Sequence, residues 1–190
     1  MKHILWLLVG LISLNGAVFA ENPPYYEQHY ASKEEALKAS FPKAIQFEEN
    51  LVSLNSLQID DLNKRLGWKI KESEFNIIKA VSAKNTCLGY AMILHEKGKY
   101  HPITFLVAVT PTFSINRIVV MIYREKIGKD VRKKRFLRQY KGKTKEDPLI
   151  VDYDIMGISG ATISSWTITA GAKKAMIIIE AVLASSMIKS

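Results

Sequence analysis

Four runs rich in β-branched and aromatic residues follow one another in the middle of the chain, and they constrain its fold more than any other feature. The runs are Phe75–Val81, Cys87–His95, Ile103–Thr110 and Ile115–Arg124. The breaks Glu96–Lys99 and Pro111–Ser114 have the composition of turns. Because connections this short join antiparallel neighbours, the sequence predicts an antiparallel β-meander.

Helical patterns lie on both sides of these runs. Ser32 and Glu35 have the spacing of a capping box, which predicts a short helix over Lys33–Ser40. A second helix is predicted over Gln58–Leu66, and a basic helical stretch around Val131–Tyr140. A C-terminal amphipathic helix is predicted from apolar residues at helical spacing, namely Ala175, Ile178, Ile179, Val182 and Leu183.

These patterns together predict an α+β fold. An antiparallel β-meander or half-barrel is flanked by helices, with a small N-terminal helical extension. The length of 190 residues suits one principal domain with a small appendage. We therefore divide the chain into an N-terminal helical extension, 21–66, and a domain that contains the sheet, 67–190.

The first twenty residues have the layout of an export signal. Lys2 is followed by the apolar run Ile4–Ile12, and no acidic residue occurs before Glu21. Val18-Phe19-Ala20 places small residues at the two positions that a signal peptidase reads. We therefore expect residues 1–20 to be a signal peptide and the protein to be periplasmic or otherwise extracytoplasmic.

An uncleaved N-terminal membrane anchor is the alternative reading of this segment. Asn15 and Gly16 interrupt the apolar run, which falls short of the roughly 20 residues that a spanning helix needs. Cleavage after Ala20 is therefore favoured. No cysteine follows the run, which excludes a lipoprotein.

The positive charge of the chain is concentrated in one segment. The chain has 27 Lys and Arg against 18 Asp and Glu, a formal net charge of +9. The basic patch, Tyr123–Lys145, holds eleven of the bases and two of the acids, so the rest of the chain is neutral. Such a patch attracts phosphate, anionic lipid or an acidic protein, although a solvated helix face is the commoner reason for one. Export argues against nucleic acid as its partner.

The sequence gives little evidence for a metal site or a catalytic nucleophile. Cys87 is the single cysteine, which excludes an intrachain disulfide and a cysteine-rich metal site. The histidines do not have the spacing of metal ligands, and no acid/base pair is evident. The sequence therefore does not predict a substrate-converting active site.

The most informative segment is Ser159–Ser165, which reads Ser-Gly-Ala-Thr-Ile-Ser-Ser and precedes the last helix. Small residues allow a bulky ligand to approach the backbone, and the unpaired N–H groups at a helix N-terminus suit a phosphate. The plain alternative is a helix cap, since Ser and Thr are good caps and glycine turns are common.

This segment resembles the flavinylation motif of the FMN-binding domain family. That family includes the periplasmic flavin subunits of the Rnf complex and of sodium-translocating NADH:quinone reductase. The resemblance extends from about Gly67 to Val182, and it implies that residues 67–190 are an FMN-binding domain. It rests on the motif and on the segments Leu88–Ala91, Pro102–Val109, Phe136–Lys143, Asp147–Leu149 and Ala172–Ala175.

The resemblance implies that a flavin transferase esterifies FMN, through its phosphate, to the last Thr of the motif, here Thr162. Ser159 and Ser164 would donate hydrogen bonds to phosphate oxygens, and a base from the patch would offset the phosphodiester charge. Trp166 is expected either to stack on the isoalloxazine ring or to anchor the helix in the core. The residues expected at the cofactor are Ser159, Gly160, Ala161, Thr162, Ser164, Ser165 and Trp166.

The function implied by the resemblance is that of an exported electron carrier. It would relay electrons between membrane or periplasmic redox partners, such as a cytochrome or a membrane reductase. The basic patch would be a docking surface for an acidic partner. A flavin reductase with its own small-molecule substrate is a weaker reading.

One position departs from the family pattern. Relatives usually carry Asp three residues before the Ser of the motif, where this chain has Met156. Asp154 and Asp152 lie close by and are alternative sources of a carboxylate. If Met156 prevents flavinylation, the alternative function is a non-flavinylated periplasmic module that docks through residues 123–145 and associates with anionic lipid or a protein complex.

Overall fold

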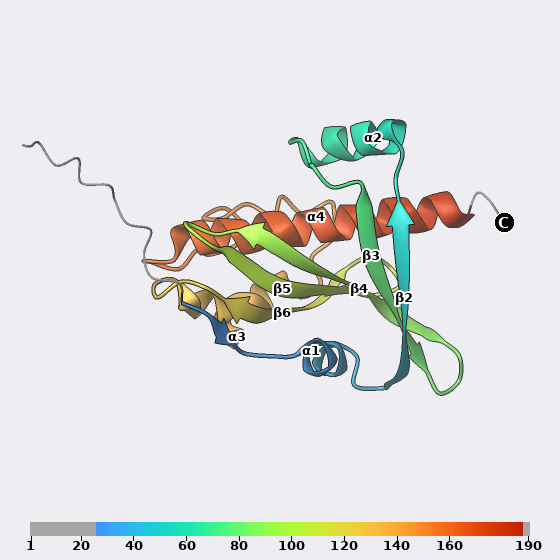
Figure 1. Ribbon diagram of the computed structural model, residues 1–190, viewed down its shortest axis with the longest axis horizontal. Coiled ribbons are helices and arrows are strands. Elements are labelled where there is room, and N and C mark those ends of the chain that lie inside the picture. The colour runs from blue at the N-terminus through green and yellow to red at the C-terminus, as the bar shows by residue number, and fades with distance from the viewer. Residues whose placement is uncertain (1–25, 188–190) are drawn as a thin grey trace, which may run out of the picture.

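The described chain forms one six-stranded antiparallel sheet with helices on both faces (Figure 1). The computed structural model describes residues 26–187 and the side chains up to residue 184. The expected signal peptide, 1–20, lies outside the described residues. The strand order is β1-β6-β5-β4-β3-β2, with bounds β1 Gln28–His29, β2 Ala44–Ser53, β3 Glu74–Ser82, β4 Cys87–Lys97, β5 Pro102–Val109 and β6 Ile115–Tyr123.

The predicted meander is confirmed, and its four strands begin and end within two residues of the predicted bounds. Strand β2 was not predicted from the sequence; it is an edge strand that pairs with β3 alone among the described strands. Ile45 and Leu51 on this strand are exposed, so its side chains show no alternation between a buried and a solvent face. Without that alternation the segment lacks the pattern that identifies a half-buried strand.

Helix α1, Lys33–Ser40, begins with the predicted capping box between Ser32 and Glu35. Helix α2, Ser56–Leu66, begins two residues before the predicted start because Asn55 forms a second capping box with Gln58. The predicted basic helix is three short turns instead of one helix. They are η1 Lys129–Arg132, α3 Lys134–Leu137 and η2 Arg138–Tyr140.

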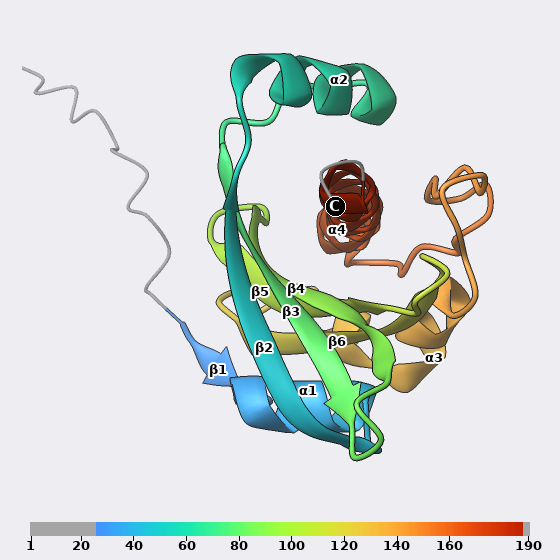
Figure 2. The same ribbon diagram turned by 90° about the vertical axis from the view of Figure 1, so that its right-hand side faces the viewer.

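The last helix, α4 Thr162–Met187, runs across the concave face of the sheet, and α2 covers its other side (Figures 1 and 2). The predicted C-terminal helix is confirmed, and its apolar residues Ala175, Ile178, Ile179 and Val182 are buried. Burial extends to every residue from Lys174 to Ile179, so this stretch is not amphipathic as predicted. Among the described residues, no helix combines the length and hydrophobicity that crossing a membrane requires.

The sheet curls around α4 (Figure 2), and Gly89 lies at one of its irregular strand pairings. Gly89 has φ +142°, and the pairing of β3 with β4 shifts register beside it. A Cβ atom at this position would lie 2.2 Å from the carbonyl oxygen of Val109 and 2.8 Å from Cε1 of Phe41. Only glycine fits here, and the irregular pairing bends the sheet.

Two apolar cores hold these layers together. The larger lies between the sheet, α4 and α2, and includes Phe105, Met176 and Ile178. The smaller lies on the opposite face of the sheet under α1 and includes Leu37 and Leu106. The larger core fixes the start of α4, and with it the motif, against the ends of the central strands.

Candidate functional site at the start of helix α4

The motif forms a tight turn that leads directly into α4. The N–H of Ala161 donates to the carbonyl of Ile158 at 2.9 Å, and Gly160 within this turn has φ +76°. Ala161 is buried, whereas Thr162, the first residue of α4, is exposed. The Thr162 hydroxyl thus lies at the helix end where the first N–H groups have no partner within the helix.

The two serines after Thr162 face inward and are already hydrogen-bonded. Ser165 Oγ donates to the carbonyl of Ala161 at 3.0 Å and accepts from the N–H of Ile158 at 3.3 Å. Ser164 Oγ lies 2.8 Å from the hydroxyl of Tyr123, which donates to the carbonyl of Ile127 at 2.8 Å. Because a phenol has one proton, Ser164 is the donor to Tyr123.

Tyr123 therefore joins the end of β6 to the first turn of α4. Burial raises the pKa of the Tyr123 hydroxyl to about 12, although its hydrogen bond with Ser164 acts in the opposite direction. The hydroxyl is protonated at neutral pH and keeps its bond to Ile127. In this arrangement the proton of Ser164 is not available to a phosphate oxygen, and the role of Ser164 is to hold the turn.

A cavity of about 440 Å³ opens beside Thr162, and we call it the Thr162 cavity. This volume lies within the range of small-molecule and cofactor sites. Its walls come from the β4–β5 turn, the segment after β6, the motif and the N-terminal arm before β1. The lining residues are Tyr26, Lys99, Tyr100, His101, Arg124, Glu125, Lys126, Ile127, Gly128, Gly160, Ala161, Thr162, Ile163 and Ser164.

Two side chains of this cavity are fixed by the surrounding structure. Glu125 Oε1 accepts from the N–H of Tyr100 at 2.8 Å and so shapes the β4–β5 turn. Arg124 Nε donates to Glu27 at 2.7 Å, and its Nη1 donates to Thr104 at 2.9 Å.

Two lysines supply the other positive charge of the cavity. Lys99 and Lys126 are exposed at the cavity, and neither forms an ion pair within residues 26–187. Together with the N-terminus of α4, they make the cavity a suitable environment for a phosphate group.

The segment that supplies most of the Thr162 cavity matches a known protein family. Residues 98–177 match the family model described as the FMN-binding domain. Residues 98–177 are an FMN-binding domain. The matched segment begins in the β4–β5 turn, contains the motif and ends in the buried part of α4, so it includes most of the Thr162 cavity.

The crystal structure of Shewanella oneidensis NqrC matches with 17% identity and a TM-score of 0.45, covering 82% of this chain and 79% of that chain. No curated protein matches.

The motif of the FMN-binding domain is divided between two cavities. Thr162, Gly160, Ala161 and Ser164 line the Thr162 cavity, whereas Ser159 lines a second cavity of about 470 Å³. Ser165 and Trp166 line neither cavity. Ser165 is buried beneath the turn. Trp166 is 58% exposed, so it does not anchor the helix in the core. Trp166 lies one turn after Thr162 on the surface of α4.

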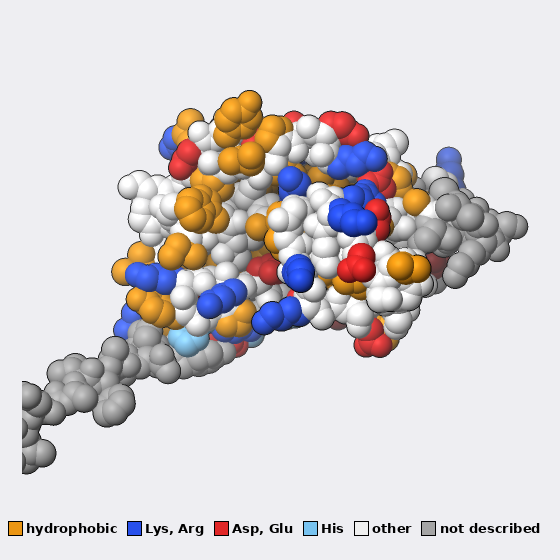
Figure 3. Space-filling model, turned by 90° about the horizontal axis from the view of Figure 1, so that it is seen from above, with side chains coloured by type: hydrophobic (Ala, Val, Ile, Leu, Met, Phe, Trp, Pro, Cys, Tyr) orange, Lys and Arg blue, Asp and Glu red, His pale blue; other side chains and the backbone are white. Residues whose placement is uncertain are grey.

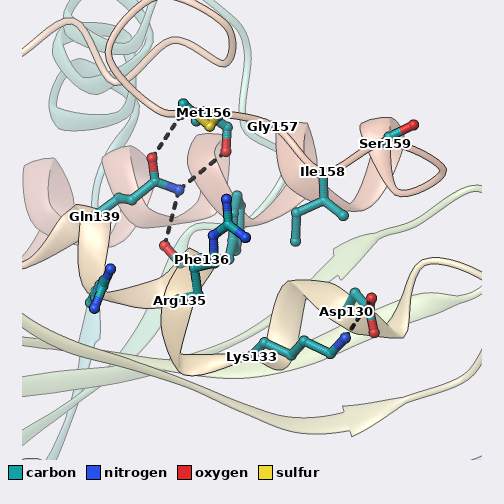
Figure 4. Close-up of a pocket in the computed structure, with 10 residues that line it drawn as sticks. Asp130, Lys133, Arg135, Phe136, Gln139, Met156, Gly157, Ile158 and Ser159 are labelled. Atoms are coloured by element: carbon teal, nitrogen blue, oxygen red, sulfur yellow. Dashed lines mark hydrogen bonds and ion pairs between the residues drawn. The ribbon is translucent and has the colours of Figure 1, made fainter.

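The second cavity, which we call the Gln139 cavity, lies between α3, η2 and the segment before the motif (Figure 4). The side-chain amide of Gln139 accepts from the N–H of Met156 at 2.8 Å and donates to its carbonyl at 3.1 Å. Gln139 also donates to the carbonyl of Phe136. Arg135 points from α3 into the space between Gln139 and Ile158 (Figure 4). The backbone of Met156 is thereby fixed, while its side chain is 69% exposed.

Neither neighbouring aspartate lies free beside the motif. Asp154 accepts from Lys143 Nζ at 2.8 Å and from the N–H groups of Ile150 at 2.7 Å and Leu149 at 3.2 Å. Asp152 accepts from the N–H of Gly157 at 3.2 Å. Both carboxylates organise the loop before the motif.

The basic patch is only partly available to a partner. Some of its bases form ion pairs, including Arg124 with Glu27, Lys133 with Asp130, Lys143 with Asp154 and Lys145 with Glu180. Arg132 lies over the ring of Tyr30 at 4.4 Å. Within residues 26–187, the patch residues that form no ion pair are Lys126, Lys129, Arg132, Lys134, Arg135, Arg138 and Lys141.

Sequence reasoning missed the residues that the other walls contribute to the Thr162 cavity. Lys99, Tyr100 and Ile127 lie in connections 35 to 63 residues before Thr162 in the chain. The turn at Glu96–Lys99 was predicted, but nothing in the sequence placed it beside the motif. Within residues 26–187, no group of three His, Cys, Asp or Glu side chains could hold a metal ion.

Proposed function

We propose that the protein is an exported electron-transfer protein that carries FMN on Thr162. The observation that supports this most directly is the exposed Thr162 hydroxyl at the N-terminus of a 26-residue helix, opening on a cavity with two lysines. A covalent bond suits a protein outside the cytoplasm, because a diffusible cofactor would be lost there.

The attachment is a phosphoester transfer from FAD by a separate flavin transferase. The Thr162 hydroxyl oxygen attacks the phosphorus of the FMN half, the bond from that phosphorus to the AMP half breaks, and AMP leaves with the electron pair. The hydroxyl proton passes to solvent. The product is FMN joined through its phosphate to Thr162 Oγ1, a gain of one FMN less one water.

The residues of the Thr162 cavity fit such a group. The N–H groups at the start of α4, with Lys99 and Lys126, would hold the phosphate. Gly160 has no side chain to obstruct the approach, and a Cβ atom there would meet nothing within 4 Å. Tyr100 offers an aromatic surface at the mouth of the cavity. Bound FMN would supply the redox chemistry, and these residues would set its position and exposure.

The test is the intact mass of the chain after co-expression and export with an active flavin transferase. We expect a gain of one FMN less one water, its loss in Thr162→Ala, and its retention in Ser159→Ala. Thr162→Ser retains a hydroxyl and should retain some modification. A Thr162→Ala sample that still carries the added mass would exclude Thr162 as the attachment site.

The patch residues that form no ion pair offer a docking surface for an acidic redox partner, such as a cytochrome or a membrane reductase. Their main effect would be on the association rate, which falls as salt screens the charges. Electron transfer to such a partner should therefore slow as ionic strength rises. A rate that does not change with salt would exclude electrostatic docking.

We also propose a second candidate function, because Met156 occupies the position where the family usually has Asp. In that case Thr162 stays unmodified and the chain is an interaction module that docks through residues 123–145. An unmodified mass, obtained with a transferase that modifies another target in the same cells, would favour this second function.

A further inference from the structure

Four large apolar side chains are exposed around the mouth of the Thr162 cavity, and we call them the apolar rim. Ile127 is 76% exposed, Trp166 58%, Tyr100 57% and Ile163 42%. Three of them line the cavity, and Trp166 is one helical turn from both Thr162 and Ile163. Exposed apolar side chains scattered singly are ordinary, but a group around one opening indicates an interaction site.

The rim is assembled from segments that are distant in the sequence. Tyr100 comes from the β4–β5 turn, Ile127 from the segment after β6, and Ile163 and Trp166 from the first turns of α4. All of these segments meet at one end of the molecule, on the left in Figure 1. Hydrophobic and basic side chains lie close together along the same end in Figure 3.

The charge at this end is positive and exposed. Lys99 and Lys126 line the same opening as the rim, and Lys99 Nζ lies 5.0 Å from the centre of the Tyr100 ring. Aromatic side chains interspersed with lysines are typical of surfaces that lie in the interface of an anionic membrane. Lysine stems can pack along apolar groups while their charges reach the lipid headgroups.

The N-terminal part of the chain joins the molecule at this end. Tyr26, the first described residue, lines the Thr162 cavity. The apolar run Ile4–Ile12 precedes it by thirteen residues, which can span at most about 45 Å. If residues 1–20 are retained as a membrane anchor, which is the alternative to a cleaved signal, the membrane that holds this run therefore lies within reach of the rim.

We propose that the end of the molecule that carries Thr162 docks on an anionic lipid bilayer. In the chain without flavin, Tyr100, Ile127, Ile163 and Trp166 enter the headgroup region, and Lys99 and Lys126 pair with lipid phosphates. The Thr162 cavity then opens toward the membrane surface. The docking depends on the folded chain and not on flavin attachment, so it stands or fails separately from the proposed cofactor.

The experiment measures whether Trp166 meets lipid in the full chain. The substitutions Trp6→Phe and Trp68→Phe leave Trp166 as the only one of the three tryptophans. Thr162→Ala is added so that no covalent flavin contributes to quenching. Vesicles of phosphatidylcholine, with or without phosphatidylglycerol, carry brominated acyl chains that quench tryptophan on contact.

We expect Trp166 fluorescence to shift to the blue and to be quenched in the vesicles that contain phosphatidylglycerol. Lys99→Gln together with Lys126→Gln should weaken the docking equilibrium by about 30-fold, as expected for two lysines near an anionic surface. Tyr100→Ser with Ile127→Ser should also reduce the quenching. The matched control is Ile45→Ser with Leu51→Ser, because these residues are 71% and 70% exposed on β2 and lie outside the rim.

Two results with the vesicles would overturn the proposal. One is a chain that floats with the vesicles while Trp166 stays unquenched, which would mean that only the N-terminal run meets lipid. The other is quenching that is equal with and without phosphatidylglycerol and unchanged by the lysine substitutions. If Trp166 is instead shielded only by adding an acidic protein, the rim is a protein interface and the proposal is wrong.

Discussion

The hydroxyl groups of Tyr123 and Ser164 lie 2.8 Å apart where the end of β6 meets the first turn of α4. This contact is buried, and Tyr123 donates onward to the carbonyl of Ile127. One phenol therefore fixes both the start of the helix that carries Thr162 and the segment that forms the opposite wall of the cavity. The geometry of the candidate site therefore depends on a buried side chain that is not part of the cavity lining.

Removal of this phenol oxygen should loosen the site and destabilise the fold. Tyr123→Phe leaves the Ile127 carbonyl and the Ser164 hydroxyl without a partner, which costs about 1–3 kcal/mol of unfolding free energy. Chemical denaturation of Tyr123→Phe, Ser164→Ala and the double variant measures the coupling between the two hydroxyls. Additive effects would contradict a direct bond.

Gly128 should tolerate alanine worse than Gly142 does. Both residues have positive φ, +91° and +82°, so alanine is strained at either position. At Gly128 a Cβ atom would also lie 2.4 Å from the Tyr123 hydroxyl and 3.0 Å from Ser164 Oγ, whereas at Gly142 it meets nothing within 4 Å. Gly128→Ala should therefore be less stable than Gly142→Ala by about 1–3 kcal/mol. An equal loss of unfolding free energy in the two variants would mean that backbone strain, and not the contact with Tyr123, causes the destabilisation.

The amide of Gln139 should hold the segment before the motif. Gln139→Ala removes both bonds to Met156 and should cost about 1–2 kcal/mol. Gln139→Glu keeps the shape but cannot donate to the Met156 carbonyl, so it should also destabilise the loop. Hydrogen exchange at the Met156 N–H is the direct measurement, and both variants should exchange faster. Normal protection in Gln139→Glu would mean that the retained bond from the Met156 N–H holds the loop, and normal protection in Gln139→Ala would mean that packing holds it.

Replacing Met156 by Asp should raise the fraction of chain that carries covalent flavin. The Met156 side chain is 69% exposed, so the change should alter the free energy of unfolding by less than about 0.5 kcal/mol. The intact-mass assay with limiting transferase compares Met156→Asp with the natural chain. Full modification of the natural chain at the same rate would show that the carboxylate is not needed.

Asp154 should make the fold sensitive to acid. Burial acts to raise the pKa of this carboxyl, but hydrogen bonds from the Ile150 and Leu149 N–H groups and from Lys143 outweigh it and hold the pKa below its ordinary value of 3.8. The ionised carboxylate therefore stabilises the folded state above pH 3.8, and this stabilisation is lost as the pH falls through the lowered pKa.

The substitution Asp154→Asn tests whether the stability contributed by Asp154 falls as the pH is lowered. The difference in unfolding free energy between the natural chain and Asp154→Asn should be largest near neutral pH and should shrink below pH 3.8. Denaturation curves across this range measure it. A difference that stays constant with pH would mean that the loss comes from packing and not from the charge.

The sequence by itself determined the local structure and the attachment residue to test. The four central strands and α1 follow from alternation, turn composition and a capping box, all of which act over a few residues. Thr162 was identified because Ser159–Ser165 resembles the flavinylation motif of the FMN-binding domain family, a resemblance carried by a few consecutive residues. Local patterns failed at β2, where both faces meet solvent and no alternation is imposed.

Only the tertiary structure decided what surrounds Thr162. The β4–β5 turn and the segment after β6 reach the motif because the sheet curls and α4 is buried between it and α2. The burial of α4, the inward bond of Ser164 and the exposure of Trp166 follow from the same packing. All of these features depend on contacts between residues that are far apart in the chain. Such contacts form because folding buries the apolar surface of the whole chain. They leave no periodic pattern in any one segment, so the sequence of a segment does not predict them.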